Sequence, residues 1–276
     1  MNGKLKIDLG EVQKTLLIPL WARAKESERR NPLIRDAHAC ELVDQLDYDF
    51  ESVIGRMPRV AVLNCVVRAR HIDAMLLDIL KEFPDAVIVN IGAGLDTTFQ
   101  RIDNGRIFWY DLDLPDTMDL RKRLIPEGDR NRMIAKSVFD RSWFDEIKVR
   151  RTKMVFIAAG VLVYLQQEDI KALFLDLMRE FPGSEIIFEI YSKLLLWLRR
   201  RAVEKREGRP DLVAPFRWGI GSAGRISKWK KGIEVLDEFP FYSRVPLPED
   251  LDKETLSQIR FVNFFKMLRM IRLKLG

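Results

Sequence analysis

Histidine and cysteine are scarce in this sequence: its 276 residues contain only two of each. Cys40 and Cys65 both lie in stretches with helical, apolar spacing, which argues against a disulfide framework or a cysteine-rich metal site and favours reduced, buried thiols. The histidines, His38 and His71, also lie in segments with helical spacing. The chain therefore offers few candidates for a general base.

Long hydrophobic runs are also absent. No apolar stretch approaches the roughly 20 residues that a transmembrane helix requires, and residues 1–10 contain no apolar core of a signal peptide. Internal repeats, low-complexity tracts and Gly/Ser linkers are missing too, so no boundary separates independent domains. We expect a cytoplasmic protein with no stable membrane association.

Positive charge is distributed unevenly along the chain. The net charge is +6, yet residues 193–231 alone contain twelve Lys/Arg against three acidic residues, so the remainder is slightly acidic. A nucleic-acid binder more often spreads basic residues over a face with interleaved aromatics. We therefore expect no nucleic acid as a partner. The basic segment is interpreted either as a solvated helix face and loop or as a cap that attracts an anionic substrate.

The order of elements indicates an α/β fold. Helices are predicted over about 16–24, 36–46 and 58–83, with Asp36 as the N-cap of the second. After Pro84 short β-branched runs alternate with helical segments, which is typical of a parallel sheet built from βαβ units. The strands are expected at 86–91, 106–112, 132–136, 154–159 and 185–191, with a helix over 167–181.

A glycine motif follows the first predicted strand. In Val89–Thr98 (VNIGAGLDTT), Gly92 and Gly94 would let the backbone turn tightly and approach a ligand. Thr97 stands where a dinucleotide-binding protein would carry a third glycine, so the ligand need not contain a diphosphate. An adenosine with an amino-acid tail fits this loop better.

An acidic residue stands at the matching distance. Asp111 and Asp113 end the second predicted strand, and Asp113 lies 21 residues after Gly92. That offset resembles the one at which a carboxylate accepts hydrogen bonds from ribose hydroxyls. Asp113 is thus a candidate ribose ligand in NAD or S-adenosylmethionine alike, whereas the simpler interpretation makes both residues turn and helix-start residues before Pro115.

Several motifs in this order resemble the leucine carboxyl methyltransferase superfamily, and within it the bacterial subgroup related to the tetracenomycin-pathway O-methyltransferase. The resemblance covers most of residues 15–191. The motifs that carry it are TLLIPLWARA (15–24), RARHID (68–73), VNIGAGLDTT (89–98), YDLDLP (110–115), SVFD (137–140) and AAGVLVYL (158–165).

The resemblance implies a Rossmann-like class I methyltransferase that binds S-adenosylmethionine, with a mostly parallel seven-stranded sheet flanked by helices. It implies an N-terminal helical cap over residues 1–84, a core over 85–276 and a lid insertion at about 192–235 after the fifth strand, all in one structural unit. Arg70, with Arg68 as the fallback, would pair with the cofactor's carboxylate. The implied cofactor-binding residues are Arg70, Gly92, Ala93, Gly94, Asp113, Leu114, Ser137, Val138 and Ala159. Many relatives carry an acidic residue where Ala159 stands, which leaves one polar contact unassigned.

The acceptor is expected to be a small molecule. Methyl transfer to a carboxylate needs no base, whereas a phenol or alcohol usually does, so the scarcity of histidine favours an anionic carboxylate. Tyr164, Tyr191 and Trp218 are candidate acceptor contacts, within a group of aromatic residues that would suit a flat, polyketide-like molecule. That group also contains Trp197, Phe216 and Trp229. Core packing is the alternative role for these side chains.

Two other functions remain open at this point. An NAD(P)-dependent oxidoreductase shares the strand, glycine and acid pattern, although the third glycine is missing. A non-enzymatic interaction protein with a degenerate Rossmann fold would use its basic segment on anionic partners, although its glycine and acid motifs are intact. The sequence predicts neither an oligomeric state nor a catalytic residue.

Overall fold

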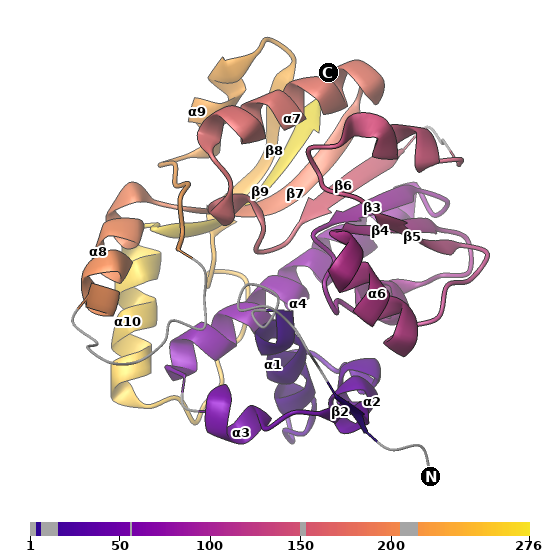
Figure 1. Cartoon of the computed structure of the whole chain (residues 1–276). Coiled ribbons are helices and arrows are strands. Elements are labelled where there is room, and N and C mark those ends of the chain that lie inside the picture. Colours follow the sequence, from indigo (N-terminus) through magenta and orange to yellow (C-terminus); the bar gives the residue numbers. More distant parts are fainter. Residues whose placement is uncertain (1–3, 7–15, 56, 150–152, 205–214) are drawn as a thin grey trace.

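The computed structural model describes residues 4–6, 16–55, 57–149, 153–204 and 215–276. Five parallel strands alternate with helices, and two antiparallel strands complete a seven-stranded sheet of order β5-β4-β3-β6-β7-β9-β8 (Figure 1). The strands of this sheet are β3 (Val87–Ile91), β4 (Phe108–Asp113), β5 (Asn131–Ala135), β6 (Met154–Ala158), β7 (Ser184–Tyr191), β8 (Ile233–Pro240) and β9 (Leu268–Leu275). The expected α/β architecture with a mostly parallel seven-stranded sheet is confirmed.

The predicted helices and strands are confirmed, with shifts of at most three residues at their ends. The helices are α1 (Leu17–Ser27), α2 (Ala37–Gln45), α3 (Phe50–Val53), α4 (Arg59–Glu82), α5 (Thr98–Ile102), α6 (Pro115–Leu124), α7 (Gln167–Glu180), α8 (Lys193–Glu204), α9 (Ala223–Ile226) and α10 (Lys253–Phe264), with short 3₁₀ helices η2 (Arg141–Glu146), η3 (Leu162–Tyr164) and η4 (Ser227–Trp229). A small parallel pair, β1 (Leu5–Lys6) and β2 (Leu46–Asp47), is an addition that the sequence pattern did not predict.

Alternation along the central strands divides the core into two layers. In β3, Ile88 packs with α4, whereas Val87 and Val89 pack on the opposite face with α7. This period of two is what a strand requires when helices cover both faces of a sheet. The predicted elements from β3 to β7 thus form the doubly covered centre of the molecule.

The N-terminal helices form a third apolar cluster. Residues of α1, α2 and α3 pack with Ala93 and Leu95, in the loop after β3, and with Met118 of α6. Figure 1 shows α1, α2 and α3 grouped beneath the sheet at one end of the molecule. They therefore lie against the glycine motif. Among the residues that the structure describes, no helix is both long enough and apolar enough to cross a membrane.

Candidate cofactor and acceptor site

The carboxyl ends of five parallel strands open into one cavity of about 600 Å³. In an open α/β sheet, ligands bind at this edge, where the strand order reverses; here that point is β3, from which the chain runs first to β4 and later to β6. Residues at or just after the carboxyl end of each of the five strands line the cavity: Gly92, Asp113, Ser137, Ala159 and Tyr191. The strand topology thus brings together motifs that are far apart in the sequence.

The two glycines of the motif after β3 adopt backbone conformations that favour glycine. Gly92 has φ +67°, and a Cβ atom there would lie 2.4 Å from Cγ2 of Val161. Gly94 has φ +49°, and a Cβ atom there would lie 3.3 Å from Cβ of Leu16. Side chains at these two positions would be strained or would collide with neighbours, so the bare backbone faces the cavity.

The Asp113 carboxylate lies beside this loop at the end of β4. It accepts hydrogen bonds from the backbone N–H groups of Gly94 and Leu114, both at 2.7 Å. Burial raises the pKa of Asp113, and the two backbone N–H bonds oppose that effect. The carboxylate is therefore held in the cavity wall with lone pairs remaining for a ligand's hydroxyl groups.

Asp111 has a structural role. Its carboxylate is fully buried and pairs with the guanidinium of Arg121 at 2.6 Å, while Trp109 Nε1 donates to it at 2.8 Å. Arg121 also donates to the carbonyl oxygens of Gly94 and Asp96 at 3.0 and 2.7 Å. The pair therefore supports the glycine loop from below, and only Asp113 of the two acids lines the cavity.

Most of the expected cofactor residues line this cavity. These residues lie at the ends of β3, β4, β5 and β6, which Figure 1 labels. The expected residues that line it are Gly92, Ala93, Gly94, Asp113, Leu114, Ser137, Val138 and Ala159. The cradle of bare backbone and the adjacent carboxylate fit an adenosine with an amino-acid tail, which is the shape of S-adenosylmethionine.

Arg70 is the exception, and here the structure corrects the expectation. Arg70 does not line the cavity, and its guanidinium donates to the carbonyl oxygen of Leu33 at 2.5 Å. Arg68 lines the cavity instead and donates to the buried Glu189 at 3.2 Å. Its guanidinium lies against the end of β6, since a Cβ atom on Gly160 would meet it at 2.8 Å. Arg68, the fallback, thus takes the place given to Arg70.

The buried Glu189 keeps Arg68 charged and in place. Burial alone would lower the pKa of Arg68, but the charge of Glu189, together with smaller contributions from Cys65, Tyr191 and Tyr164, raises that pKa. Burial also raises the pKa of Glu189, and Arg68 opposes this effect. Sequence reasoning missed Glu189, because a charged residue in a central strand reads only as an interruption of an apolar run.

Asp96 is a second residue that sequence reasoning missed. It lines the cavity two residues before α5, where its carboxylate accepts from Asn90 Nδ2 at 3.1 Å. Burial would raise the pKa of Asp96, but the nearby charges of Arg23 and Arg101 outweigh it and lower that pKa. Its position within the VNIGAGLDTT motif was the available signal. Asp96 supplies an anionic group in the cavity that Ala159 also lines, where one polar contact was left unassigned.

The far wall of the cavity is aromatic and basic. Phe216 packs edge-on against Tyr164 and Tyr191, with ring centroids 5.3 and 5.1 Å apart. The guanidinium of Arg199, on α8, lies 3.7 Å from the centroid of the Phe216 ring, and Arg217 lines the cavity beside it. Tyr164 and Tyr191 therefore lie where acceptor contacts were expected. Residues 205–214 of the basic segment are outside the described residues.

Trp218 does not reach this wall, contrary to expectation. It is 3% exposed and packs against Phe188 and Trp229 in the core layer that contains α7. Because neighbouring residues of an extended segment point in opposite directions, Arg217 faces the cavity and Trp218 faces the core. Trp229 shares that core layer, and Trp197 is half exposed beneath Arg201.

Neither histidine of the chain lines this cavity. His71 is 3% exposed and its Nε2 lies 2.6 Å from the carbonyl oxygen of Phe241. Burial lowers the pKa of His71 and raises the pKa of the Tyr164 hydroxyl. Among the described residues at the Tyr164 end of the cavity, burial likewise raises the pKa of the Tyr191 hydroxyl, so neither tyrosine is suited to remove a proton at neutral pH.

The assignment of Arg68 leads to a prediction with a built-in comparison. We expect Arg68→Met, made together with Glu189→Gln, to weaken binding of S-adenosylhomocysteine by about tenfold or more, the value of one charge-assisted hydrogen bond. Binding of methylthioadenosine, which lacks the carboxylate, should stay unchanged. The second substitution avoids leaving a buried carboxylate unpaired. Calorimetry measures the affinity of the variant for both ligands.

The matched control for this prediction is Arg70→Met on the same helix. It should change the affinity for neither ligand, because Arg70 faces the carbonyl of Leu33. Equal weakening of both ligands in the double variant would show that Arg68 acts on the fold and not on the carboxylate.

Comparison with known proteins identifies the family. The model of the leucine carboxyl methyltransferase family matches residues 17–178. Tetracenomycin polyketide synthesis O-methyltransferase TcmP of Streptomyces glaucescens is 32% identical over 84% of both chains. The S-adenosyl-L-methionine-dependent methyltransferase dpfgK of Gibberella zeae is 27% identical over 68% of this chain and 67% of its own.

Solved structures support the fold. A DUF574-family protein from Streptomyces avermitilis superposes with a TM-score of 0.59 at 12% identity, covering 95% of this chain and 97% of its own. A SAM-dependent methyltransferase from Anabaena variabilis gives a TM-score of 0.51 at 13% identity, covering 100% and 99%. By its family model and by its similarity to TcmP, this chain belongs to the leucine carboxyl methyltransferase family.

Proposed function

We propose that this chain is an S-adenosylmethionine-dependent O-methyltransferase that esterifies the carboxylate of a small, flat, aromatic acceptor. Family membership and relatives that carry such names support the cofactor and the reaction class. The observation that carries the acceptor is the shared cavity, which joins the glycine loop and Asp113 to a wall of tyrosine, phenylalanine and arginine. These findings favour a methyltransferase over the NAD(P) oxidoreductase and the non-enzymatic protein.

Different residues of the cavity would bind different parts of the cofactor. Gly92 and Gly94 would lie under the methionine portion, Asp113 would hold the ribose hydroxyls, and Ser137 and Val138 would border the adenine. Arg68 and Asp96 would take the carboxylate and the ammonium group of the amino-acid tail. When bound, the cofactor supplies an electrophilic methyl group on a positively charged sulfur.

The acceptor end is built to hold an anion. Arg199 and Arg217 line it, and a guanidinium group can bind a carboxylate through two parallel hydrogen bonds. The rings of Tyr164, Tyr191 and Phe216 offer faces and edges for a flat aromatic molecule. A carboxylate is already ionised at neutral pH, so these residues need only hold it in line with the methyl group and exclude water.

The acceptor assignment is tested by pairing acids with phenols of the same ring system, such as 2-naphthoic acid and 2-naphthol, and their polycyclic counterparts. We expect methyl esters from the acids at a rate that is nearly independent of pH from 6 to 9, because no group has to lose a proton. Arg199→Gln should raise the acceptor KM by about tenfold, as one charged hydrogen bond is lost, while S-adenosylhomocysteine affinity is kept.

The control for that variant is Arg201→Gln, an exposed arginine of the same helix that lies over Trp197 outside the cavity. It should leave the acceptor KM unchanged. Methylation of the phenols in preference to the acids, with a rate that rises with pH, would contradict the carboxylate assignment and leave the methyltransferase activity intact.

Cys40 and Cys65 are both free thiols, which is compatible with the cytoplasmic location we propose.

A further inference from the structure

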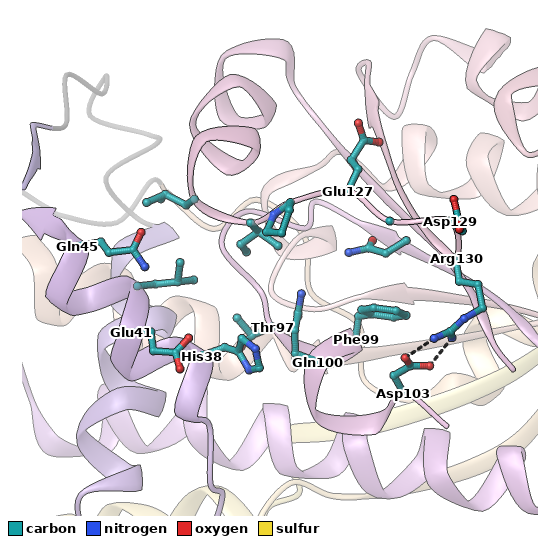
Figure 2. Close-up of a pocket in the computed structure, with 16 residues that line it drawn as sticks. His38, Glu41, Gln45, Thr97, Phe99, Gln100, Asp103, Glu127, Asp129 and Arg130 are labelled. Carbon is teal, nitrogen blue, oxygen red and sulfur yellow. Dashed lines mark hydrogen bonds and ion pairs between the residues drawn. The ribbon is translucent and has the colours of Figure 1, made fainter. Parts of the chain in front are cut away.

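A second cavity, of about 640 Å³, lies between α2, α5 and the loop that joins α6 to β5 (Figure 2). It shares no lining residue with the cofactor cavity. The nearest link is Thr97, which lines the second cavity, whereas its neighbours Asp96 and Thr98 line the first. The volume falls within the range of small-molecule sites in proteins, about 300–1,000 Å³.

Two side-chain amides of this cavity have unused acceptor atoms. Asn131 is 3% exposed, and its Oδ1 has no hydrogen-bond partner among the residues that the structure describes. The buried Oε1 of Gln100 also has none within that part of the chain. Figure 2 shows the Gln100 side chain extending into the space between α2 and the loop. Because a buried acceptor without a donor is costly, both oxygens call for a ligand that donates hydrogen bonds.

The net charge of the residues that line the cavity is negative. Asp103 and Arg130 pair with each other, with Nη2 and Oδ2 2.6 Å apart, as the dashed lines in Figure 2 show. Glu41, Glu127 and Asp129 add three further carboxylates, of which Glu127 accepts from the backbone N–H of Met133 at 2.7 Å and Asp129 lies 3.9 Å from Arg132. The lining is therefore acidic, although the chain as a whole carries +6. Such a lining attracts a cation.

The described residues of this cavity do not form a usual ligand set for a metal ion, so an organic cation is the better candidate. The described residues contain no group of three or more His, Cys, Asp or Glu side chains that could hold one. Apolar side chains also form part of the wall and suit a hydrocarbon arm better than a hydrated ion. The apolar lining residues are Leu42, Phe99, Leu124, Ile125 and Pro126.

We propose that this cavity is a binding site, separate from the cofactor and acceptor site, for a small organic cation with a hydrocarbon arm. An alkylguanidine or alkylamine provides both features. Its N–H groups donate to the orphaned oxygens of Gln100 and Asn131, its charge faces the carboxylates of Glu41 and Glu127, and its arm packs on Phe99.

The first experiment titrates the whole protein with agmatine, which carries a guanidinium and an ammonium group on a four-carbon arm. Calorimetry should show saturable one-to-one binding, both with and without bound S-adenosylhomocysteine, because the two cavities are separate. Butanoate, an anion with an arm of similar length, should give no saturable binding. No saturable binding of agmatine would overturn the proposal.

Variants then locate the site. Asn131→Leu and Gln100→Leu each remove one buried acceptor at similar volume, and each should weaken agmatine binding by about tenfold. Glu41→Gln should weaken it by about threefold, whereas Asp44→Asn, the same charge change on the same helix but outside the cavity, should not.

Two variants protect the test against misfolding. Glu41 and Asp44 are exposed on α2, so their substitutions are not expected to disturb the fold. Agmatine binding that survives Glu41→Gln, Gln100→Leu and Asn131→Leu unchanged, or that S-adenosylhomocysteine abolishes by competition, would place the cation elsewhere and refute the proposal.

Discussion

Asp36→Ala is expected to lower the free energy of unfolding by about 3–5 kcal/mol, the usual cost of breaking a buried ion pair by removing one partner. Asp36 is 1% exposed, and its carboxylate pairs with Arg23 at 2.8 Å and with Arg101 at 2.7 Å. It also accepts from Thr97 Oγ1 at 2.5 Å and from the backbone N–H of Ala39, as the N-cap of α2. Urea unfolding at pH 7 measures the loss.

The same network joins the N-terminal helices to the cofactor loop. Arg23, on α1, also donates to the carbonyl oxygen of Leu95 at 2.9 Å, next to the glycine motif. Thr97 and Arg101 belong to the loop and helix that follow β3. Removing Asp36 leaves two buried guanidinium groups without their shared partner, so the cofactor loop should loosen along with α1 and α2.

The pH dependence of this effect has a definite sign. Burial would raise the pKa of Asp36, but the charges of Arg23 and Arg101 outweigh it and lower that pKa below its ordinary value. A lowered pKa stabilises the fold above the unfolded-state pKa of about 3.9 and loses that contribution as the pH falls through the folded-state pKa. The difference between wild type and Asp36→Asn should therefore stay constant from pH 8 to 5 and narrow below about pH 4.

Asp252→Ala provides the control for the capping contribution. Asp252 caps α10 in the same way, by accepting from Thr255 N at 2.7 Å, but it is exposed and pairs with no buried arginine. Its loss should cost about 1 kcal/mol. If Asp36→Ala costs no more than Asp252→Ala, the buried network adds nothing beyond the cap.

Asp113→Ala is expected to weaken S-adenosylhomocysteine binding by about 100-fold or more, because it would remove the two charge-assisted hydrogen bonds to the ribose that we propose for this carboxylate. It also removes the acceptor that holds the N–H of Gly94 at 2.7 Å. Asp113→Asn keeps one acceptor oxygen and should show a smaller loss, of about tenfold. Calorimetry with the purified variants measures both affinities.

Asp119→Asn is the matched control for Asp113, since it removes one carboxylate from the exposed side of the neighbouring helix α6. It should bind S-adenosylhomocysteine like wild type. An Asp113→Ala variant with unchanged affinity would remove Asp113 from the cofactor site. If NADH quenches the tryptophan fluorescence of the wild-type protein and S-adenosylhomocysteine does not bind, the assignment of S-adenosylmethionine as the cofactor is contradicted.

Much of the cofactor half of the site follows from local sequence. Gly92 and Gly94 lie in the loop after β3 and Asp113 ends β4, and parallel strands bring their carboxyl ends to one edge. Periodicity places the elements because a strand covered on both faces and a helix covered on one need different apolar patterns. The N-cap at Asp36 is equally local, since the side chain bonds a backbone N–H three residues later.

Other features depended on which face of an element meets the cavity. Arg68 and Arg70 are two residues apart on α4, which rotates their side chains by about 200° from each other. The motif RARHID contains both, and only the packing of α4 on the sheet brings Arg68 to Glu189. The same holds for Arg217 and Trp218, where the direction of an irregular segment decided which residue faces the cavity.

By itself, the sequence determined the order of the parallel strands β3 to β7, the glycine loop and the acid beside it, because these depend on contacts between near neighbours in the chain. Only the tertiary structure decided the acceptor wall and the second cavity. Phe216 packs against Tyr164 and Tyr191, and Gln100 lines one cavity with the loop before Asn131, across elements that no local pattern relates. Cavities form between elements, so their shape and charge depend on how whole helices pack.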